Sequence, residues 1–424
     1  MVQAHIPQSR FSSSPISVAI FCMPLRGHLQ RLLPLISDLS TLGHRVYVFT
    51  HKQFQPDIQE IGGHFVDLFS KYPLDAVDDR SIPFASRYIS FAGKYLEGIL
   101  NDVKAYKPSL IVYDTYAVIG RIVGTLLELP HVNVCAGHNR MGSRAVENRR
   151  RSPVSISKAC YTAVKKLNNL GLKDVTPYYY LCAKSPYLNI YCEPPGFLPP
   201  AERQPFEPIA FFGSVQPDNA SMKAEPMWFS APSSKKLRLF ISFGTVIWFY
   251  HAMEAFAALE TLSRVVGQLR WVEAVITLGG WSADARLLSR LRKPNVRVER
   301  YVDQWNVLRE ADVFVTHHGL NSTHEAIFHG VPMISYPFAA DQPALAQRCQ
   351  ELGLAIRLAD APLDCVRPKR FVDAINQICE DRHGFDIRLA QARTWELDVI
   401  AARKQVIQKV LDLTKVSAFH RRAS

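Results

Sequence analysis

The residues best suited to chemistry lie between positions 311 and 326, where a short apolar run ending at Thr316 is followed by His317, Gly319 and several small polar residues. The apolar run is typical of a buried strand. Asn321 or Ser322 can cap a helix that begins after the turn at Gly319. The first turn of a helix has unpaired backbone N–H groups and the positive end of the helix dipole. The segment is therefore predicted to bind an anion such as a diphosphate.

Two side chains can extend this site. His317, at the end of the strand, can donate a hydrogen bond to a phosphate oxygen. Glu325 lies one turn into the helix, on the same side as Ser322, where a carboxylate can accept hydrogen bonds from both hydroxyls of a ribose. Taken alone, the same residues also fit a capped helix whose glutamate faces solvent.

The elements that must position these residues alternate between strands and helices in both halves of the chain. In the first half we predict strands at 16–23, 45–50, 109–113 and 131–136, with helices at 29–42 and near 117–127. In the second half we predict strands at 237–243 and near 271–278, 296–300, 312–316 and 332–336. Such alternation is typical of α/β folds with parallel sheets. We expect two doubly wound, Rossmann-like domains that face a central cleft, with ligands at the carboxyl ends of the strands.

Domain boundaries follow from composition. Prolines accumulate between residues 183 and 210, and polar and small residues then lead to a strong new strand. We predict an N-terminal domain over 1–214, a linker over 215–235 and a C-terminal domain over 236–393. An amphipathic helix over 394–424 is predicted to pack back toward the N-terminal domain.

The chain has 424 residues, of which 48% are hydrophobic and 21% charged, so it can form two cores. Its net charge of +12 suits an anionic partner. Nucleic acid is disfavoured because the basic residues are spread along the whole chain. The densest cluster, 140–173, leaves three interpretations open: a solvated helical face, contact with a membrane surface, or an anionic acceptor.

The eight cysteines form no CxxC pair and no dense framework, which suits a reducing cytoplasm. The apolar stretch 16–25 lacks a small-residue cleavage site, and no run of about 18 apolar residues predicts a spanning helix. No D-x-D motif and no His/Cys cluster with zinc spacing occurs.

The stretch 301–342 resembles the donor-binding signature of nucleotide-sugar-dependent glycosyltransferases of the two-domain GT-B type. The similarity is to the inverting family that includes plant secondary-metabolite glucosyltransferases and bacterial macrolide glycosyltransferases. The matching residues are Gln304, Val307, Leu308, Thr316, His317, Gly319, Asn321, Ser322, Thr323, Glu325, Ala326, Gly330, Val331, Pro332, Met333, Pro337, Asp341 and Gln342.

This resemblance implies a role for each part of the stretch. His317 and the helix start at Asn321 and Ser322 bind the pyrophosphate, and Glu325 binds the ribose. Asp341 and Gln342 bind the sugar hydroxyls; the alternative for that pair is a helix N-cap followed by a surface glutamine. The implied nucleotide-sugar site also contains Gly244, Thr245, Tyr301, Val302, Gln304 and Gly319.

Three features of the donor site depart from the pattern or match it less specifically. Tyr301 stands where the family usually has a tryptophan that stacks on the pyrimidine, and a tyrosine can still stack. Asp303 replaces the usual proline, which leaves the preference between uracil and thymine open. The turn at Gly244 and Thr245 resembles a phosphate-approaching turn of the family, but a plain strand-to-helix turn fits Thr245 almost as well.

The turn at Gly27 and His28 resembles the family's Gly-His turn, so His28 is implied to be the general base, a task that suits a neutral imidazole. Asp114 matches the aspartate that orients this histidine, with an Asx turn as the alternative. Arg31 stands where the family typically has proline.

We therefore expect an inverting, metal-independent transferase that moves a hexose from a UDP-sugar, or else a dTDP-sugar, to a hydroxyl of a small, moderately apolar acceptor. The nucleotide sugar is a co-substrate, and no resident cofactor is expected. Tyr88 and Phe91 are candidates to line the acceptor pocket. The alternatives are a membrane-surface transferase with a lipid acceptor, a non-catalytic nucleotide-sugar-binding protein, and a nucleotide-sugar epimerase.

Overall fold

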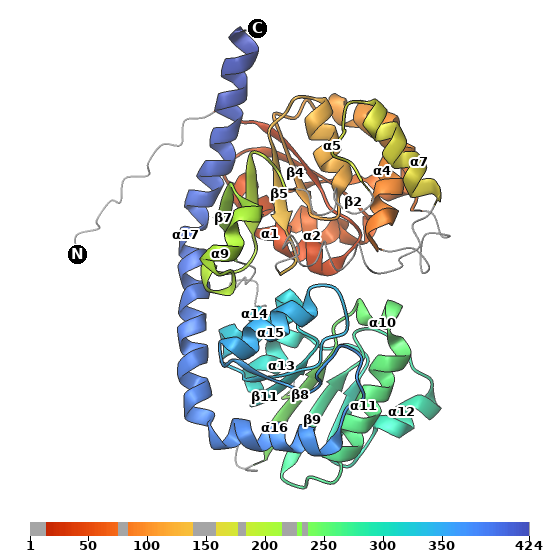
Figure 1. Cartoon of the computed structure of the whole chain (residues 1–424), viewed down its shortest axis with the longest axis vertical. Coiled ribbons are helices and arrows are strands. Elements are labelled where there is room, and N and C mark those ends of the chain that lie inside the picture. Colours follow the sequence, from red (N-terminus) through yellow and green to blue (C-terminus); the bar gives the residue numbers. More distant parts are fainter. Residues whose placement is uncertain are drawn as a thin grey trace, which may run out of the picture.

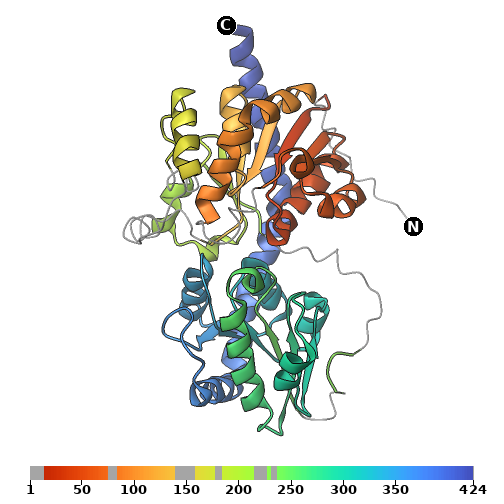
Figure 2. The same cartoon turned by 90° about the vertical axis from the view of Figure 1, so that its right-hand side faces the viewer.

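The computed structural model describes residues 14–74, 84–138, 158–176, 184–213, 227–230 and 236–423. These residues form two stacked α/β domains, with a long C-terminal helix running alongside both (Figure 1). Figure 2 shows the same two domains from the side. The predicted fold class is confirmed. The predicted linker and the first part of the basic cluster, 140–157, fall mainly outside the described residues.

The N-terminal domain is built on a seven-stranded parallel sheet in the order β3-β2-β1-β4-β5-β6-β7. Its strands are β1 (Ser17–Phe21), β2 (Arg45–Thr50), β3 (His64–Asp67), β4 (Leu110–Asp114), β5 (His131–Cys135), β6 (Leu188–Tyr191) and β7 (Ile209–Phe211). Its helices are α1 (Arg26–Thr41), α2 (Gln55–Glu60), α3 (Leu68–Lys71), α4 (Phe84–Ala105), α5 (Val118–Leu126), α7 (Lys158–Asn169) and α9 (Pro200–Arg203). Every residue of β1, β4, β5 and β6 is buried, as the continuous apolar runs of a covered parallel sheet require.

The C-terminal domain has a six-stranded parallel sheet in the order β10-β9-β8-β11-β12-β13. Its strands are β8 (Leu237–Ser242), β9 (Val272–Thr277), β10 (Val296–Glu299), β11 (Val313–Thr316), β12 (Met333–Ser335) and β13 (Ala355–Arg357). Its helices are α10 (Ile247–Tyr250), α11 (Ala252–Val266), α12 (Ala285–Leu291), α13 (Gln304–Glu310), α14 (Leu320–His329), α15 (Gln342–Glu351) and α16 (Pro368–Glu380). In each sheet the order reverses beside the first strand, and loops at that switch point are the usual place for a ligand.

Two helix starts differ from the prediction. Helix α1 begins at Arg26 rather than Leu29, because the carbonyl of Leu25 already accepts hydrogen bonds from the N–H groups of His28 and Leu29. His28 therefore lies in the first helical turn. Helix α14 is capped by the backbone of Gly319, and neither Asn321 nor Ser322 caps it, because both already lie inside the helix.

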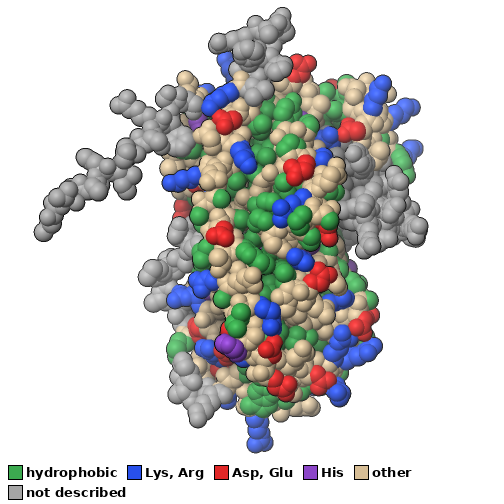
Figure 3. Space-filling model, turned by 60° about the vertical axis from the view of Figure 1, so that its left-hand side comes forward, with side chains coloured by type: hydrophobic (Ala, Val, Ile, Leu, Met, Phe, Trp, Pro, Cys, Tyr) green, Lys and Arg blue, Asp and Glu red, His purple; other side chains and the backbone are tan. Residues whose placement is uncertain are grey.

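The C-terminal helix α17 (Arg382–Ala423) starts twelve residues earlier than the predicted 394. Phe385, Leu389 and Ala392 are buried at helical spacing, which extends the apolar face toward α16. The helix packs against α14 in one domain and against α1 and β7 in the other. On the side that carries α17, positive and negative side chains are interspersed among hydrophobic ones (Figure 3).

Candidate functional site

The first turn of α1 and the end of β4 bring His28 and Asp114 together. The Nδ1 atom of His28 lies 2.8 Å from Oδ1 of Asp114, and the carboxylate is fully buried. Asp114 also accepts hydrogen bonds from the backbone N–H groups of Met23 and Tyr116, each at 2.8 Å. The bond from Tyr116 is the Asx turn considered above, so the turn and the pair with His28 coexist. Because Nδ1 faces a carboxylate, it carries the proton, and Nε2 remains to accept one.

Two glycines leave room for the imidazole of His317 at the end of β11. A Cβ atom built on Gly244 would lie 2.7 Å from the imidazole, and one on Gly319 would lie 2.5 Å from its Nε2. Gly244 also has a φ of +68°, a conformation that other residues rarely adopt. Burial lowers the pKa of His317 to about 4, so the ring is neutral near pH 7. The neighbouring His318 instead contacts the hydroxyl groups of Thr323 and Ser335 in the core.

Glu325 and Ser322, on one side of α14, share Gln304 of α13 as a partner. The amide nitrogen of Gln304 donates to Oε2 of Glu325 at 2.6 Å and to Oγ of Ser322 at 3.1 Å. Burial raises the pKa of Glu325 to about 7, although the hydrogen bond from Gln304 opposes the shift. Tyr301 is 66% exposed nearby, whereas Val302 is buried.

Asp341 and Gln342 stand at the start of α15. Asp341 occupies the N-cap position, but its side chain makes no capping bond; its Oδ2 accepts from the backbone N–H of His138 in the other domain at 3.0 Å. The carbonyl oxygen of Gln342 accepts from the backbone N–H groups of Phe338 and Ala339. The amide nitrogen of Gln342 is therefore the part suited to a ligand.

The starts of α1 and α14 meet across the two domains. The amide nitrogen of Asn321 donates to the side-chain oxygen of Gln30 at 2.5 Å. A Cβ atom on Gly27 would lie 3.8 Å from the same nitrogen of Asn321. This contact brings the turn that carries His28 beside the helix start predicted to bind a diphosphate.

The two candidate acceptor residues, Tyr88 and Phe91, are both buried in the core of the N-terminal domain. The ring of Tyr88 lies 5.7 Å from that of Tyr116, which lies 4.8 Å from that of His28. Tyr88 thus contacts Tyr116, which in turn contacts the candidate base His28. Thr245 follows the Gly244 turn before α10.

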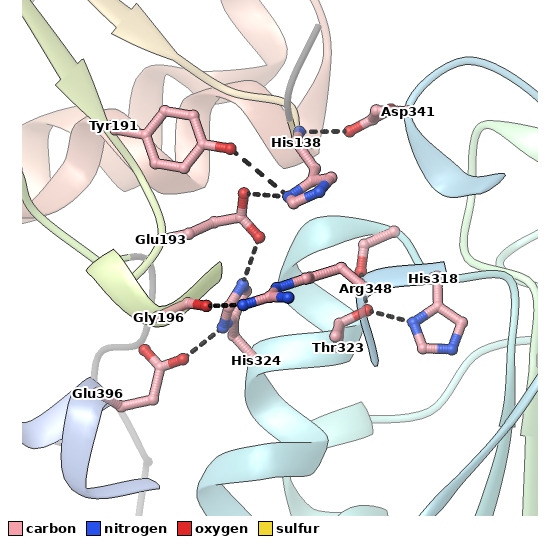
Figure 4. Close-up of polar contacts among 11 residues, drawn as sticks. His138, Tyr191, Glu193, Gly196, His318, Thr323, His324, Asp341, Arg348 and Glu396 are labelled. Atoms are coloured by element: carbon pink, nitrogen blue, oxygen red, sulfur yellow. Dashed lines mark hydrogen bonds and ion pairs between the residues drawn. The ribbon is translucent and has the colours of Figure 1, made fainter. Parts of the chain in front are cut away.

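Sequence reasoning missed a buried chain of ionisable side chains at the domain junction, which we name the junction network: His138, Glu193, His324 and Glu396 (Figure 4). Glu193 accepts from His138 at 2.8 Å and from His324 at 3.0 Å, and the other nitrogen of His324 contacts Glu396 of α17. All four side chains are at most 4% exposed. No local pattern reveals this network, because its members come from four separate segments.

The charges in the junction network follow from its contacts. Burial alone would lower the pKa of His324, but Glu396 and Glu193 outweigh that effect and raise it to about 9. Burial alone would raise the pKa of Glu193, but His138 and His324 outweigh it and hold the pKa below its ordinary value. At neutral pH an imidazolium therefore links two carboxylates, and it fixes α14 to the N-terminal domain and to α17.

Across the described ranges, no group of three or more His, Cys, Asp and Glu side chains is arranged to hold a metal ion. No helix in the described part of the chain is long and apolar enough to cross a membrane. The seven cysteines that the structure describes are all free thiols.

Comparison with known proteins finds a matching family, similar relatives and similar solved structures. Residues 263–393 match the family described as erythromycin biosynthesis protein CIII-like, C-terminal domain. The NDP-glycosyltransferase YjiC of Bacillus subtilis (strain 168) is 25% identical over 374 residues, covering 86% of this chain and 89% of that protein.

Two solved structures have the same fold. The calicheamicin glycosyltransferase CalG4 superposes with a TM-score of 0.71 at 22% identity, over 95% of this chain and 100% of that one. The spinosyn rhamnosyltransferase SpnG, solved with thymidine diphosphate, gives a TM-score of 0.64 at 20% identity, over 92% of this chain and 99% of that one. The fold, the matched domain and the named relatives agree, and the chain is a glycosyltransferase of the GT-B type.

Proposed function

We propose that the protein transfers a hexose from a nucleoside diphosphate sugar to a hydroxyl of a small, moderately apolar acceptor, with inversion at the anomeric carbon and without a metal ion. The observation that carries the proposal is the contact between Asn321 and Gln30, because it sets the His28–Asp114 pair beside the start of α14. A direct displacement needs a base for the acceptor hydroxyl and a site for the anionic leaving group. In this proposal, the start of α1 supplies the base and the start of α14 supplies the anion site.

In the proposed reaction, Nε2 of His28 takes the proton of the acceptor hydroxyl while Nδ1 keeps its hydrogen bond to Asp114. The acceptor oxygen forms a bond to the anomeric carbon, and the bond from that carbon to the diphosphate oxygen breaks. The electron pair leaves with the diphosphate. The backbone N–H groups at the start of α14 and the neutral His317 stabilise the developing negative charge.

A UDP-hexose is our first choice of donor, with a dTDP-sugar as the alternative. The exposed ring of Tyr301 can stack on either pyrimidine. SpnG was solved with thymidine diphosphate, which supports a pyrimidine diphosphate site in this fold. Asp341 and the amide nitrogen of Gln342 together accept from and donate to hydroxyls, so they favour a fully hydroxylated sugar.

An apolar acceptor is supported by four exposed side chains around α10. Val246, Phe249, Tyr250 and Met253 are 36%, 71%, 40% and 79% exposed. Figure 1 shows α10 at the edge of the C-terminal domain nearest the other domain.

We also propose a reducing cytoplasm as the compartment, which the free thiols support. The membrane-surface alternative rested on the basic cluster 140–173. All five of its arginines lie outside the described residues, and no observation on the described residues favours a lipid acceptor.

The proposal is tested with UDP, dTDP and GDP by thermal shift, since a ligand that binds only the folded state must stabilise it. UDP and dTDP are expected to raise Tm, and GDP is expected to have little effect. With UDP-glucose and a panel of phenolic and macrolide acceptors, NMR of the product should show a β-linked sugar. A folded protein that binds neither UDP nor dTDP contradicts the proposal, and an α-linked product contradicts the inverting mechanism.

A further inference from the structure

Arg31 lies on α1, three residues after His28, and its side chain is only 3% exposed. Residues three apart on a helix are neighbours on its surface, so Arg31 lies next to the candidate base. Arginine is almost never fully buried unless it is paired. The position of Arg31 therefore needs an explanation.

The guanidinium of Arg31 is incompletely satisfied. Its Nε and Nη1 atoms are buried without a hydrogen-bond partner in the described part of the chain. The thiol of Cys192 is a side-chain hydrogen-bond partner, but burial raises the pKa of that thiol to about 11, so it is neutral and does not balance the charge. Glu193, a candidate counter-ion for Arg31, is already bound by His138 and His324.

The electrostatic surroundings of Arg31 indicate where the missing partner lies. Burial lowers the pKa of Arg31, whereas the carboxylates of Glu193, Asp341 and Glu325 oppose that shift. In the proposed function, Glu325 holds the ribose and Asp341 holds the sugar. The group that joins a ribose to a sugar in a nucleotide sugar is the diphosphate. Gln30, which precedes Arg31 in α1, contacts Asn321 at the start of α14, so this part of α1 lies beside the helix start that is proposed to bind the diphosphate.

We propose that Arg31 binds a diphosphate oxygen of the donor, so that the N-terminal domain adds a positive charge to the anion site of the C-terminal domain. This inference rests on the proposed function and extends it to a further residue. An arginine fork suits phosphate oxygens because it can donate two parallel hydrogen bonds. The donor then contacts both domains, and Arg31 also stabilises the leaving group in the transition state.

The test compares Arg31→Met, which removes the charge but keeps an apolar stem, with Arg31→Lys, which keeps a charge without the fork. Arg45→Gln is the matched control, because it also removes one positive charge but lies exposed at the start of β2. Dissociation constants for UDP, UDP-glucose, UDP-glucuronate and uridine are measured by calorimetry or NMR titration. Unfolding midpoints verify that each variant is folded.

Arg31→Met is expected to weaken UDP and UDP-glucose about 10- to 100-fold and to leave uridine within about 2-fold, since a charge-assisted hydrogen bond is lost only from the phosphates. Arg31→Lys should fall between Arg31→Met and the wild type, and Arg45→Gln should match the wild type. If Arg31→Met fails to fold, Arg31→Lys carries the test through the ratio of UDP to uridine affinity.

Three outcomes overturn the inference. Equal losses for UDP and uridine would mean that Arg31 only supports packing. A loss confined to UDP-glucuronate would mean that it binds a sugar carboxylate instead. Unchanged UDP affinity in a folded Arg31→Met protein rejects the inference while the proposed function stands, whereas a wild type that binds no UDP or dTDP rejects both.

Discussion

Helix α14 contributes side chains to two polar regions that differ in how their hydrogen-bonding groups are used. On one side, Ser322 and Glu325 belong to the proposed donor site, where Glu325 has a pKa of about 7 and accepts a hydrogen bond from the amide of Gln304. On the other side, His324 belongs to the junction network, where both of its nitrogens contact carboxylates. Consecutive residues on a helix point about 100° apart, so one segment can supply both regions. The proposed donor site keeps hydrogen-bonding capacity for a ligand, whereas both nitrogens of His324 are used to join three parts of the fold.

The largest effect is expected for His28, which lies on α1 and belongs to neither of these two regions. His28→Ala removes the base but leaves α14 intact, so turnover should fall about 10²- to 10⁴-fold. UDP affinity should stay within about 2-fold of the wild type. Steady-state kinetics and calorimetry measure the two effects, and a variant that turns over normally would rule out His28 as the base.

The second prediction breaks the junction network. Glu396→Gln keeps the shape of the side chain but removes one of the two charges that hold His324, so the free energy of unfolding should fall by about 3 kcal/mol. Glu299→Gln is the control, because Glu299 pairs with Arg297 at the surface and should matter little. Chemical denaturation measures both, and equal stability of the two variants would contradict the structural role of the network.

The same network predicts a dependence of stability on pH. The pKa of His324 is raised from 6.5 to about 9, so its ion pairs contribute fully below pH 6.5, and this contribution is lost as the pH rises through 9. The expected loss is on the order of 3 kcal/mol at alkaline pH, and it should be smaller in Glu396→Gln. Denaturation curves between pH 6 and pH 10 check this, and identical pH profiles for the two proteins would count against it.

The fourth prediction concerns Glu325 in the proposed donor site. Glu325→Gln should weaken UDP-glucose about 10-fold, because an amide accepts ribose hydroxyls less well than a carboxylate. In the wild type, affinity should rise modestly as the pH passes 7, where Glu325 becomes charged, and the variant should lose that rise. UDP-glucose is the suitable probe because its phosphates do not titrate in this range. Calorimetry at pH 6 and pH 8 measures the UDP-glucose affinity of both proteins.

The smallest effect is expected at the apolar edge. Phe249→Ser removes a side chain that is 71% exposed, so KM for an apolar acceptor should rise about 3- to 10-fold while UDP affinity stays the same. Leu363→Ser, at another exposed apolar position, is the control. An equal change in both variants would show that the edge around α10 has no special relation to the acceptor.

Most residues of the proposed donor site lie in one continuous stretch, 301–342, so the sequence alone could suggest them together. The alternation of apolar runs predicted four strands of the first sheet and five of the second, and it missed β3, β6, β7 and β13. Local exceptions were harder to foresee. The start of α1 was missed because Arg26 and Gly27 interrupt the apolar pattern, and the cap of α14 was misassigned because its backbone makes the turn without a side chain. The junction network could not be predicted, since a histidine gains a charge here only from carboxylates distant in the sequence. The roles of the site residues and the domain limits stay predictions.

Helix α17 has a mechanical consequence for catalysis. It packs on α14, which carries donor residues, and on α1, which carries His28. A continuous helix resists bending far more than a loop does. Any separation of the two domains therefore has to slide one domain along α17 or bend α17. If nucleotide release requires such a separation, we expect that shortening or stiffening α17 changes turnover without altering any residue proposed to contact the substrate.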